Sequence, residues 1–337
     1  MTKLSVLDLV RVKEGGDAGT ALEESKNLAI HLERLGYERI WISEHHNSTG
    51  IASAATAVVL AHLGAATKTI RLAAEGIMLP NHAPYIIAEQ FGTLARLFPG
   101  RIDLGLGRAP GTDQTAVRAM RRPPMASDTF PQDVLELQSY FEPLEPGQRL
   151  VASPAEGTEV PLTILGSSQF GAALAGDLGL PYAFASHFAP GLLIEALEIY
   201  RERFQPSKQL DKPYAMVGVN VIAAETDEEA RYLATSQLKS FAHLYQHGSG
   251  GPLGPPVDNI EDYVSAPVRE QASRMLARSV IGSASTVKKG LEDLIAETGA
   301  DELIIVSDVF DPELRHRSFE IVASVMGLRT VQAALLV

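Results

Sequence analysis

Polar residues that can move protons or bind anions follow many of the short apolar runs in this sequence. They include Asp8, Glu44, His45, His46, Glu75, His82, Arg108, Ser167, Ser168 and His187. An imidazole or a carboxylate can exchange a proton near neutral pH, and a guanidinium beside hydroxyl groups can bind a phosphate. This pattern indicates an active site assembled from the ends of several strands.

The run Glu44-His45-His46-Asn47 offers the ligand types of a zinc site that needs no cysteine. One interpretation is therefore a metal-dependent hydrolase that uses His45, His46 and a carboxylate. Adjacent residues leaving a strand point in opposite directions, however, and no HxH or HExxH spacing accompanies them. We therefore expect no metal site. The structural alternative is that one histidine caps the strand end and the other is solvated.

A second candidate site binds phosphate. Gly166-Ser167-Ser168 leads from an apolar run into a helical segment, so backbone N–H groups and hydroxyls are available there. Arg108 follows the preceding apolar run and could add a bidentate, charge-assisted contact. The structural alternatives are that the serines only cap the helix and that the arginine is solvated.

Composition excludes several classes of function. The chain of 337 residues is 45% apolar and carries a formal net charge of -12, without a run of Lys or Arg. Binding to nucleic acid or to an anionic membrane is therefore not expected. Without cysteine, redox chemistry needs a bound cofactor. Because no signal peptide or membrane-length apolar segment is recognisable, we expect a cytoplasmic protein.

Apolar runs alternate with amphipathic segments along the whole chain, which favours a (β/α)8 barrel in one domain over residues 1–337. The expected strands cover residues 4–9, 39–43, 70–78, 101–106, 162–165, 182–185, 215–223 and 302–307. Two regions exceed a simple βα unit. We expect an elaborated crossover at residues 108–161 with one helix at 132–141, and an inserted loop at about 245–280.

Several local signals place the helices. Thr20 and Glu23 have capping-box spacing at the start of the first helix, and Gly36 ends that helix. Residues 52–65 predict an alanine-rich helix, and Asp311 is the expected N-cap of the last helix. The Gly- and Pro-rich residues 247–259 are a candidate mobile lid.

The dinucleotide-binding alternative fails. A doubly wound sheet normally carries G-x-G-x-x-G after its first strand. The G-x-G that follows a strand here is Gly105-Leu106-Gly107, and Pro110 occupies the third glycine position.

Three segments together resemble the bacterial luciferase-like flavin-dependent monooxygenases. They are RIWISEHHNSTGIASA, IRLAAEGIMLPNHAPYIIAEQFGTLARLFPGRIDLGLGRAPGTD and LGSSQFGAALAGDLGLPYAFASHF. The resemblance is to the single-chain branch of this family, outside the light-emitting αβ heterodimers. Gly107 stands where the catalytic chain of luciferase has a cysteine, so the sequence departs from the light-emitting enzymes at this position.

The resemblance implies a role for each candidate residue. His45 matches a histidine near the reacting flavin that is a proposed acid and base, and Arg108 matches an arginine that binds the FMN phosphate. Gly166, Ser167 and Ser168 fall where the family closes its phosphate site. Glu75-Gly76 matches a peptide that is often cis and presses against the isoalloxazine ring. We further expect Asp8 in the cofactor site, and the substrate pocket is expected to contain His46, His82 and His187.

The implied activity is a monooxygenase. Reduced FMN, supplied by a separate flavin reductase, would react with O2 through a flavin C4a-hydroperoxide and oxidise a small organic substrate. A homodimer formed through the second and third barrel helices is also implied. Two alternatives stay open: hydride transfer with FMN or the deazaflavin F420, and a flavin-binding protein without catalysis.

Overall fold

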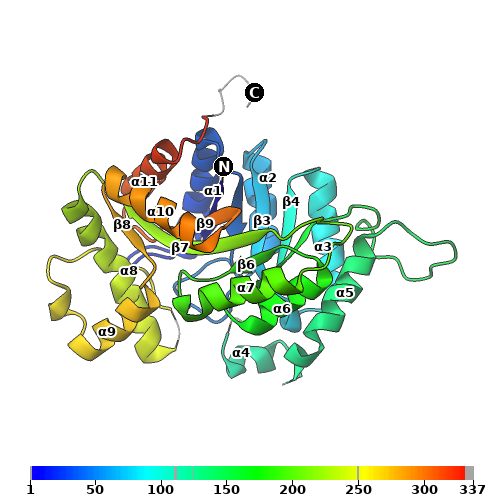
Figure 1. Cartoon of the computed structure of the whole chain (residues 1–337). Coiled ribbons are helices and arrows are strands. Elements are labelled where there is room, and N and C mark those ends of the chain that lie inside the picture. Colours follow the sequence, from blue (N-terminus) through cyan, green and yellow to red (C-terminus); the bar gives the residue numbers. More distant parts are fainter. Residues whose placement is uncertain (1, 110–111, 124, 249, 331–337) are drawn as a thin grey trace.

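The parallel strands of the chain close into a barrel with helices around it, as the computed structural model shows in Figure 1. The structure describes residues 2–109, 112–123, 125–248 and 250–330. The barrel strands are β1 (Lys3–Asp8), β2 (Arg39–Ile42), β3 (Arg71–Met78), β4 (Ile102–Gly107), β5 (Leu162–Gly166), β6 (Tyr182–Phe184), β7 (Ala215–Ala223) and β9 (Glu302–Val306). The expected (β/α)8 barrel is confirmed.

Helices connect successive strands on the outside of the barrel. They are α1 (Ala18–Leu35), α2 (Thr56–Ala66), α3 (Pro84–Leu97), α4 (Gln114–Ala119), α5 (Phe130–Phe141), α6 (Gln169–Leu178), α7 (Leu193–Arg203), α8 (Asp227–His247), α9 (Ala266–Met275), α10 (Ala284–Thr298) and α11 (Pro312–Val325). Short 3-10 turns cover Leu79–Asn81, Ala126–Thr129, Pro190–Leu192 and Ile260–Asp262. No helix in the described ranges combines the length and apolar character that crossing a membrane requires.

Closure of the barrel depends on β6, which is three residues long. Tyr182 pairs with Ile164 of β5 on one side and with Ala215 of β7 on the other. β9 then lies between β7 and β1 and completes the ring. Because all of these strands run parallel, their carboxyl ends meet at one face of the barrel.

The structure corrects several local expectations. The N-cap of α1 is Asp17, whose Oδ1 accepts the backbone N–H of Thr20 at 2.8 Å, so Thr20 is already inside the helix. α2 begins at Thr56 rather than at residue 52, since residues 52–55 still belong to the loop after β2. By contrast, Gly36 and Asp311 cap α1 and α11 as expected.

The two insertions contain more regular structure than expected. Besides α5, the crossover after β4 holds α4, which the side chain of Asp113 caps. The region 245–280 is not a plain loop, because it holds the end of α8 and all of α9. A short ninth strand, β8 (Val280–Gly282), pairs with the end of β7 outside the ring. In Figure 1, α8, α9 and β8 lie together at the left of the view.

Apolar side chains fill the middle of the barrel. This interior cluster consists of Leu7, Trp41, Ala73, Ala183, Met216, Ile304 and Val306. Trp41 is the largest of them and is fully buried. Its indole N–H donates to Ser5 Oγ at 3.1 Å, so its one polar group is satisfied.

The end of the barrel at which the strands begin is closed by buried charges. Arg39 contacts Asp103 at 3.0 Å and Glu302 at 3.1 Å. Ser5 and Tyr214 donate hydrogen bonds to the two carboxylate oxygens of Glu302, at 2.6 and 2.8 Å. Because each charge has partners, this layer can be buried without leaving an isolated ion.

Glu75, in the middle of β3, is a buried carboxyl group inside the barrel. Its Oε2 atom is buried without a hydrogen-bond partner among the described residues. Burial, together with the negative charge of Glu302, raises the pKa of Glu75 from 4.5 to about 8. Glu75 is therefore protonated at neutral pH in the folded protein.

This proton gives a stability prediction. Unfolded Glu75 releases its proton near pH 4.5 but folded Glu75 keeps it to about pH 8, so the wild-type protein loses stability as pH rises through that window. Glu75→Gln should abolish this pH-dependent loss of stability, because glutamine does not ionise. The variant and wild type should have similar stability near pH 4.5. At pH 8 the variant should be more stable by on the order of 1 kcal/mol or more.

Urea unfolding of the flavin-free protein between pH 4.5 and pH 8 measures this difference. Glu145→Gln, at an exposed loop position, is the matched control and should follow wild type at every pH. A constant difference between Glu75→Gln and wild type across the range would contradict the prediction.

Candidate active site

The candidate site lies at the face of the barrel where the strands end. Asp8 ends β1, Arg108 follows β4, Gly166 ends β5 and His187 follows β6. Glu75 and Gly76 lie within β3, short of its end. The structure therefore places the predicted residues around one barrel mouth, but in separate groups.

The first group surrounds the start of α6. Gly107 of β4 pairs with Leu165 of β5, so Arg108 and Gly166 are the next residues along two adjacent strands. The guanidinium of the exposed Arg108 lies 4.3 Å from the centre of the Phe170 ring. Ser168 is the N-cap of α6, yet its side chain makes no capping hydrogen bond. The helix start thus has backbone donors to offer, with a cation nearby.

The second group is the Glu75-Gly76 peptide bond, which is cis, as the resemblance implies. A side chain at position 76 has no room: a Cβ atom there would lie 2.5 Å from Leu165 Cδ1 and 3.1 Å from the backbone nitrogen of Gly107. The glycine thus allows β3 to approach β4 and β5 closely at this point.

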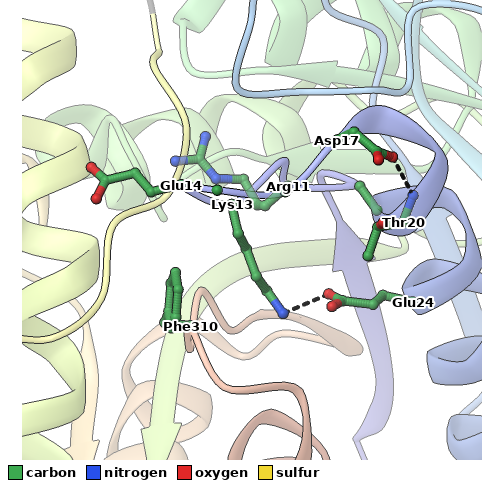
Figure 2. Close-up of a pocket in the computed structure, with 10 residues that line it drawn as sticks. Arg11, Lys13, Glu14, Asp17, Thr20, Glu24 and Phe310 are labelled. Carbon is green, nitrogen blue, oxygen red and sulfur yellow. Dashed lines mark hydrogen bonds and ion pairs between the residues drawn. The ribbon is translucent and has the colours of Figure 1, made fainter.

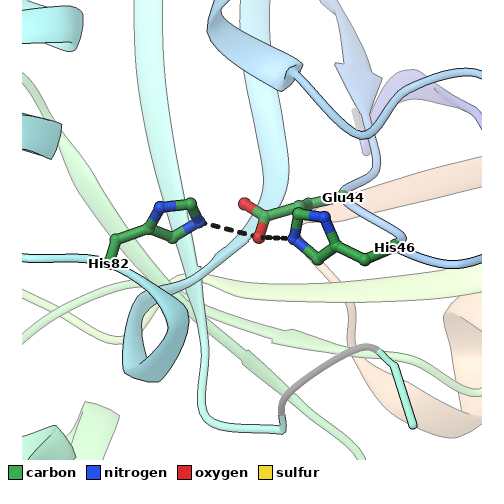
Figure 3. Close-up of side chains that lie close together, drawn as sticks. All are labelled: Glu44, His46 and His82. Atoms are coloured by element: carbon green, nitrogen blue, oxygen red, sulfur yellow. Dashed lines mark hydrogen bonds and ion pairs between the residues drawn. The ribbon is translucent and has the colours of Figure 1, made fainter. Parts of the chain in front are cut away.

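The third group joins two of the predicted pocket histidines through a residue that was not assigned to the site. His46 and His82 each donate a ring N–H to Oε1 of Glu44, over 2.7 and 2.8 Å (Figure 3). The other oxygen of Glu44 accepts the backbone N–H of Met78 at 3.3 Å. Burial alone would raise the pKa of Glu44, but the hydrogen bonds from the two histidines hold it below its ordinary value.

His187 belongs to a different group from His46 and His82. It is buried against Gly218 of β7, where a Cβ atom would lie 2.5 Å from its Nδ1. Burial, and secondarily the nearby His45, lowers the pKa of His187 to about 4. A neutral imidazole therefore lies near His45, the predicted catalytic residue.

Two polar residues of this last group were missed. The amide of Asn220 donates to the backbone carbonyl of His187, and Gln237 of α8 donates to Asn220 Oδ1 at 2.8 Å. Asn220 could have been found, because it is the one polar side chain in the apolar run Ala215–Ala223. Gln237 has no such signal, since its helix has many polar residues.

Buried ion pairs lie between the ends of β1 and β9. Arg315 contacts Asp8 Oδ1 at 3.0 Å, and Arg11 lies 3.7 Å from Asp308 Oδ2. Around the mouth, several other buried polar atoms lack a hydrogen-bond partner among the described residues. They are Asp8 Oδ2, His187 Nδ1, Ser307 Oγ, Asp308 Oδ1 and Gln237 Oε1. Leaving such an atom unsatisfied costs about 1–3 kcal/mol, so this set indicates a site for a polar ligand.

The segment after β4 holds the loops of the mouth in place. Thr112 donates to the carbonyl of His46 at 3.1 Å. Arg122 donates to the carbonyls of Pro80 and His82, at 2.8 and 3.1 Å. Residues 110, 111 and 124 of this segment lie outside the described residues.

The candidate lid is attached to the loop after β1. The N–H of Leu253 donates to the carbonyl of Val12 at 2.8 Å, and the N–H of Glu14 donates to the carbonyl of Leu253 at 2.9 Å. Leu253 itself is buried. The described part of 247–259, which omits residue 249, therefore has a defined contact with the barrel, and its motion stays a prediction.

A hollow of about 190 Å³ opens beside the mouth, between this loop and Phe310 (Figure 2). Lys13 points across it to Glu24, with 2.6 Å between Nζ and Oε2. Asp17, on its rim, is occupied in capping α1. None of the predicted cofactor residues lines this hollow, so we assign the site to the barrel mouth instead.

Comparison with known proteins shows the family of this chain. Residues 2–302 match the family model described as luciferase-like monooxygenase. A protein of Escherichia coli (strain K12) with that name is 46% identical over 322 residues, which cover 95% of this chain and 96% of that protein. The N-acetyl-S-alkylcysteine monooxygenase of Bacillus subtilis (strain 168) is 35% identical over 240 residues, which cover 68% of this chain and 70% of that enzyme.

Solved structures share the fold. Apo-MsnO8 has a TM-score of 0.86 at 31% identity and covers 98% of this chain, with all of its own chain matched. Two more distant neighbours show the fold alone. A type II Baeyer-Villiger monooxygenase component from Pseudomonas putida, in complex with FMN, has a TM-score of 0.70 at 18% identity, covering 98% of this chain and 99% of its own. An F420-dependent secondary alcohol dehydrogenase has a TM-score of 0.71 at 16% identity, covering 96% of this chain and 98% of its own. With its family model and its relatives both matched over most of its length, this chain belongs to the luciferase-like monooxygenase family, a family of flavin-dependent oxidoreductases.

Proposed function

We propose that this protein is a monooxygenase that uses reduced FMN and O2 to oxidise a small organic substrate. The observation that favours a phosphate-bearing flavin is that Arg108 lies over Phe170 in the first turn of α6, where the Ser168 side chain makes no capping bond. A phosphate would satisfy both the helix donors and the guanidinium. The unsatisfied polar atoms around the mouth suit the N–H and carbonyl groups of a flavin ring.

Each predicted residue then has a task. Arg108, Gly166, Ser167 and Ser168 would bind the phosphate. Glu75-Gly76 and Asp8 would contact the ring system. Bound reduced flavin would supply the electrons that activate O2. The protein would bind the substrate, transfer protons and exclude water.

His45 is the proposed acid and base. Its neighbour His187 is held neutral at pH 7, so it adds no competing positive charge. His46, His82 and His187 would contact the substrate from two sides of the mouth. Residues 250–259, together with the segment after β4, would exclude bulk water.

We also propose that a separate flavin reductase delivers the reduced FMN, as the family resemblance implies. Free reduced flavin reacts with oxygen, so transfer from the reductase should be direct or rapid. We therefore propose that both proteins share one compartment, the cytoplasm. Purified protein should not oxidise NADH with FMN until a reductase is added, and cell fractionation would locate it.

Stopped-flow spectroscopy tests the activity. Protein mixed anaerobically with reduced FMN and then with oxygenated buffer should give an absorbance spectrum distinct from both reduced and oxidised FMN, and this spectrum should persist. The first substrate panel should include S-alkyl thioethers, because a relative is named for such a substrate. His45→Ala should slow substrate oxidation by about 10²-fold or more.

His62→Ala is the matched control, since His62 is an exposed histidine on α2. It should behave as wild type. Immediate return to oxidised FMN, with and without substrate, would argue against a monooxygenase. Turnover without oxygen would instead favour hydride transfer with FMN or F420, and tight binding of oxidised FMN without turnover would favour a flavin-binding protein.

The phosphate contact can be isolated by comparing FMN with riboflavin, which lacks the phosphate. Arg108→Ala should weaken FMN binding by about 10- to 100-fold and leave riboflavin binding nearly unchanged, because one charge-assisted contact is lost. Fluorescence titration measures the affinities for FMN and for riboflavin. Arg118→Ala, at an exposed arginine of α4, should change neither affinity. Equal weakening of both flavins by Arg108→Ala would show that Arg108 does not bind phosphate.

A homodimer through α2 and α3 is also proposed. Val58 of α2 is 69% exposed, and Ile86 and Leu97 of α3 are 46% and 60% exposed. A hollow of about 360 Å³, lined by the ends of both helices, adjoins Leu97. An interface through these two helices would bury the exposed apolar side chains.

Sedimentation velocity tests the dimer. Val58→Glu with Leu97→Glu should convert a dimer to monomers, whereas Tyr232→Glu, at an exposed aromatic residue of α8, should not. A wild-type protein that sediments as a monomer at micromolar concentration would contradict the proposal.

A further inference from the structure

We propose that Glu44, His46 and His82 form a binding site for a divalent transition-metal ion of the zinc or cobalt class. This inference does not rest on the proposed flavin chemistry. The earlier expectation of no metal was based on His45 and His46, which leave β2 as neighbours. His46 has a different partner in the structure: His82, from the turn after β3 (Figure 3).

The geometry of the three donors suits such an ion. One ligand atom from each residue lies within 4.8 Å of the other two, and the two closest separations are 2.7 and 2.8 Å. Metal bonds of about 2.0–2.2 Å require neighbouring ligand atoms about 3 Å apart. The two imidazole nitrogens lie within 4.8 Å of each other, so the rings would move towards a shared ion as it binds.

The charge of the cluster also favours a cation. Glu44 is only 1% exposed. Within the described ranges, no lysine or arginine forms an ion pair with it, and its ion-pair partners are the two histidines. A buried carboxylate whose partners are imidazoles gains more from a divalent ion than from neutral donors. Two histidines and one carboxylate select zinc, cobalt or nickel over magnesium or calcium.

The surroundings fix the ligands and leave one side open. The backbones of His46 and His82 are held by Thr112 and Arg122, and Glu44 Oε2 is held by the Met78 N–H. The side chains of His46 and His82 keep 18% and 27% of their surface exposed. Three protein ligands with an open side leave coordination positions for water or for an oxygen atom of a ligand at the mouth.

Without a metal, both imidazoles donate a ring N–H to Glu44, so metal binding through the same nitrogens requires each ring to carry its proton on the other nitrogen. The two states can be distinguished spectroscopically. Cobalt(II) bound by nitrogen and oxygen ligands absorbs visible light, and its spectrum reports the coordination geometry.

The experiment titrates CoCl2 into the full-length protein after dialysis against EDTA. One equivalent should bind with a visible absorption spectrum, and ZnCl2 should displace it. His82→Gln and Glu44→Gln should each weaken cobalt binding by about tenfold or more. His62→Gln, at a histidine that lies 3.4 Å from Glu23 on the surface, is the matched control and should leave binding unchanged.

Circular dichroism melts establish that each variant is folded. His46→Gln replaces any variant that is not, because the His46 side chain is 18% exposed. Absence of stoichiometric cobalt binding to wild type would overturn the proposal, as would equal binding by wild type and folded variants. Glu44 would then serve to orient two imidazoles by hydrogen bonds alone. If the wild-type protein binds cobalt but shows no flavin-dependent oxidation, the proposed function is wrong and the metal site is still supported.

Discussion

The candidate site depends on the closure of the barrel through β6. This strand contributes only Tyr182–Phe184, yet it pairs on both sides and joins the sheet into a ring. In an open sheet, Arg108 after β4 and Asp8 at the end of β1 would lie at separate places along an edge. In the ring they surround one opening, and side chains from distant parts of the sequence face a common space.

The buried polar groups at the two ends of the barrel differ in how they are paired. At the closed end, Arg39 forms ion pairs with Asp103 and Glu302, so the buried charges balance one another without a ligand, although Arg39 Nε makes no hydrogen bond among the described residues. At the mouth, buried atoms such as Asp8 Oδ2 and His187 Nδ1 lack partners in the described structure. The polar groups at the closed end stabilise the fold, while those at the mouth incur a cost that a bound molecule can remove.

The sequence predicted those features that local chemistry determines. Alternating patterns located the eight barrel strands, Gly36 and Asp311 capped helices as expected, and the Glu75-Gly76 peptide is cis as the resemblance implied. Other features depend on contacts between distant residues and left no local signal. The pairing of His46 with His82 across Glu44 is one, because it arises only when the loops after β2 and β3 meet. The short strand β8 is another, because it forms only by pairing with the end of β7 outside the ring.

The segment after β4 holds the neighbouring loops by their backbone rather than by their side chains. Thr112 and Arg122 donate to the carbonyl oxygens of His46, Pro80 and His82, and every residue type offers such an oxygen. A substitution at position 46 or 82 therefore changes the chemistry of the mouth without removing the contacts that hold the loops. In evolutionary terms, a lineage can exchange one set of side chains at the mouth for another in single steps, while the backbone contacts of the segment after β4 stay in place.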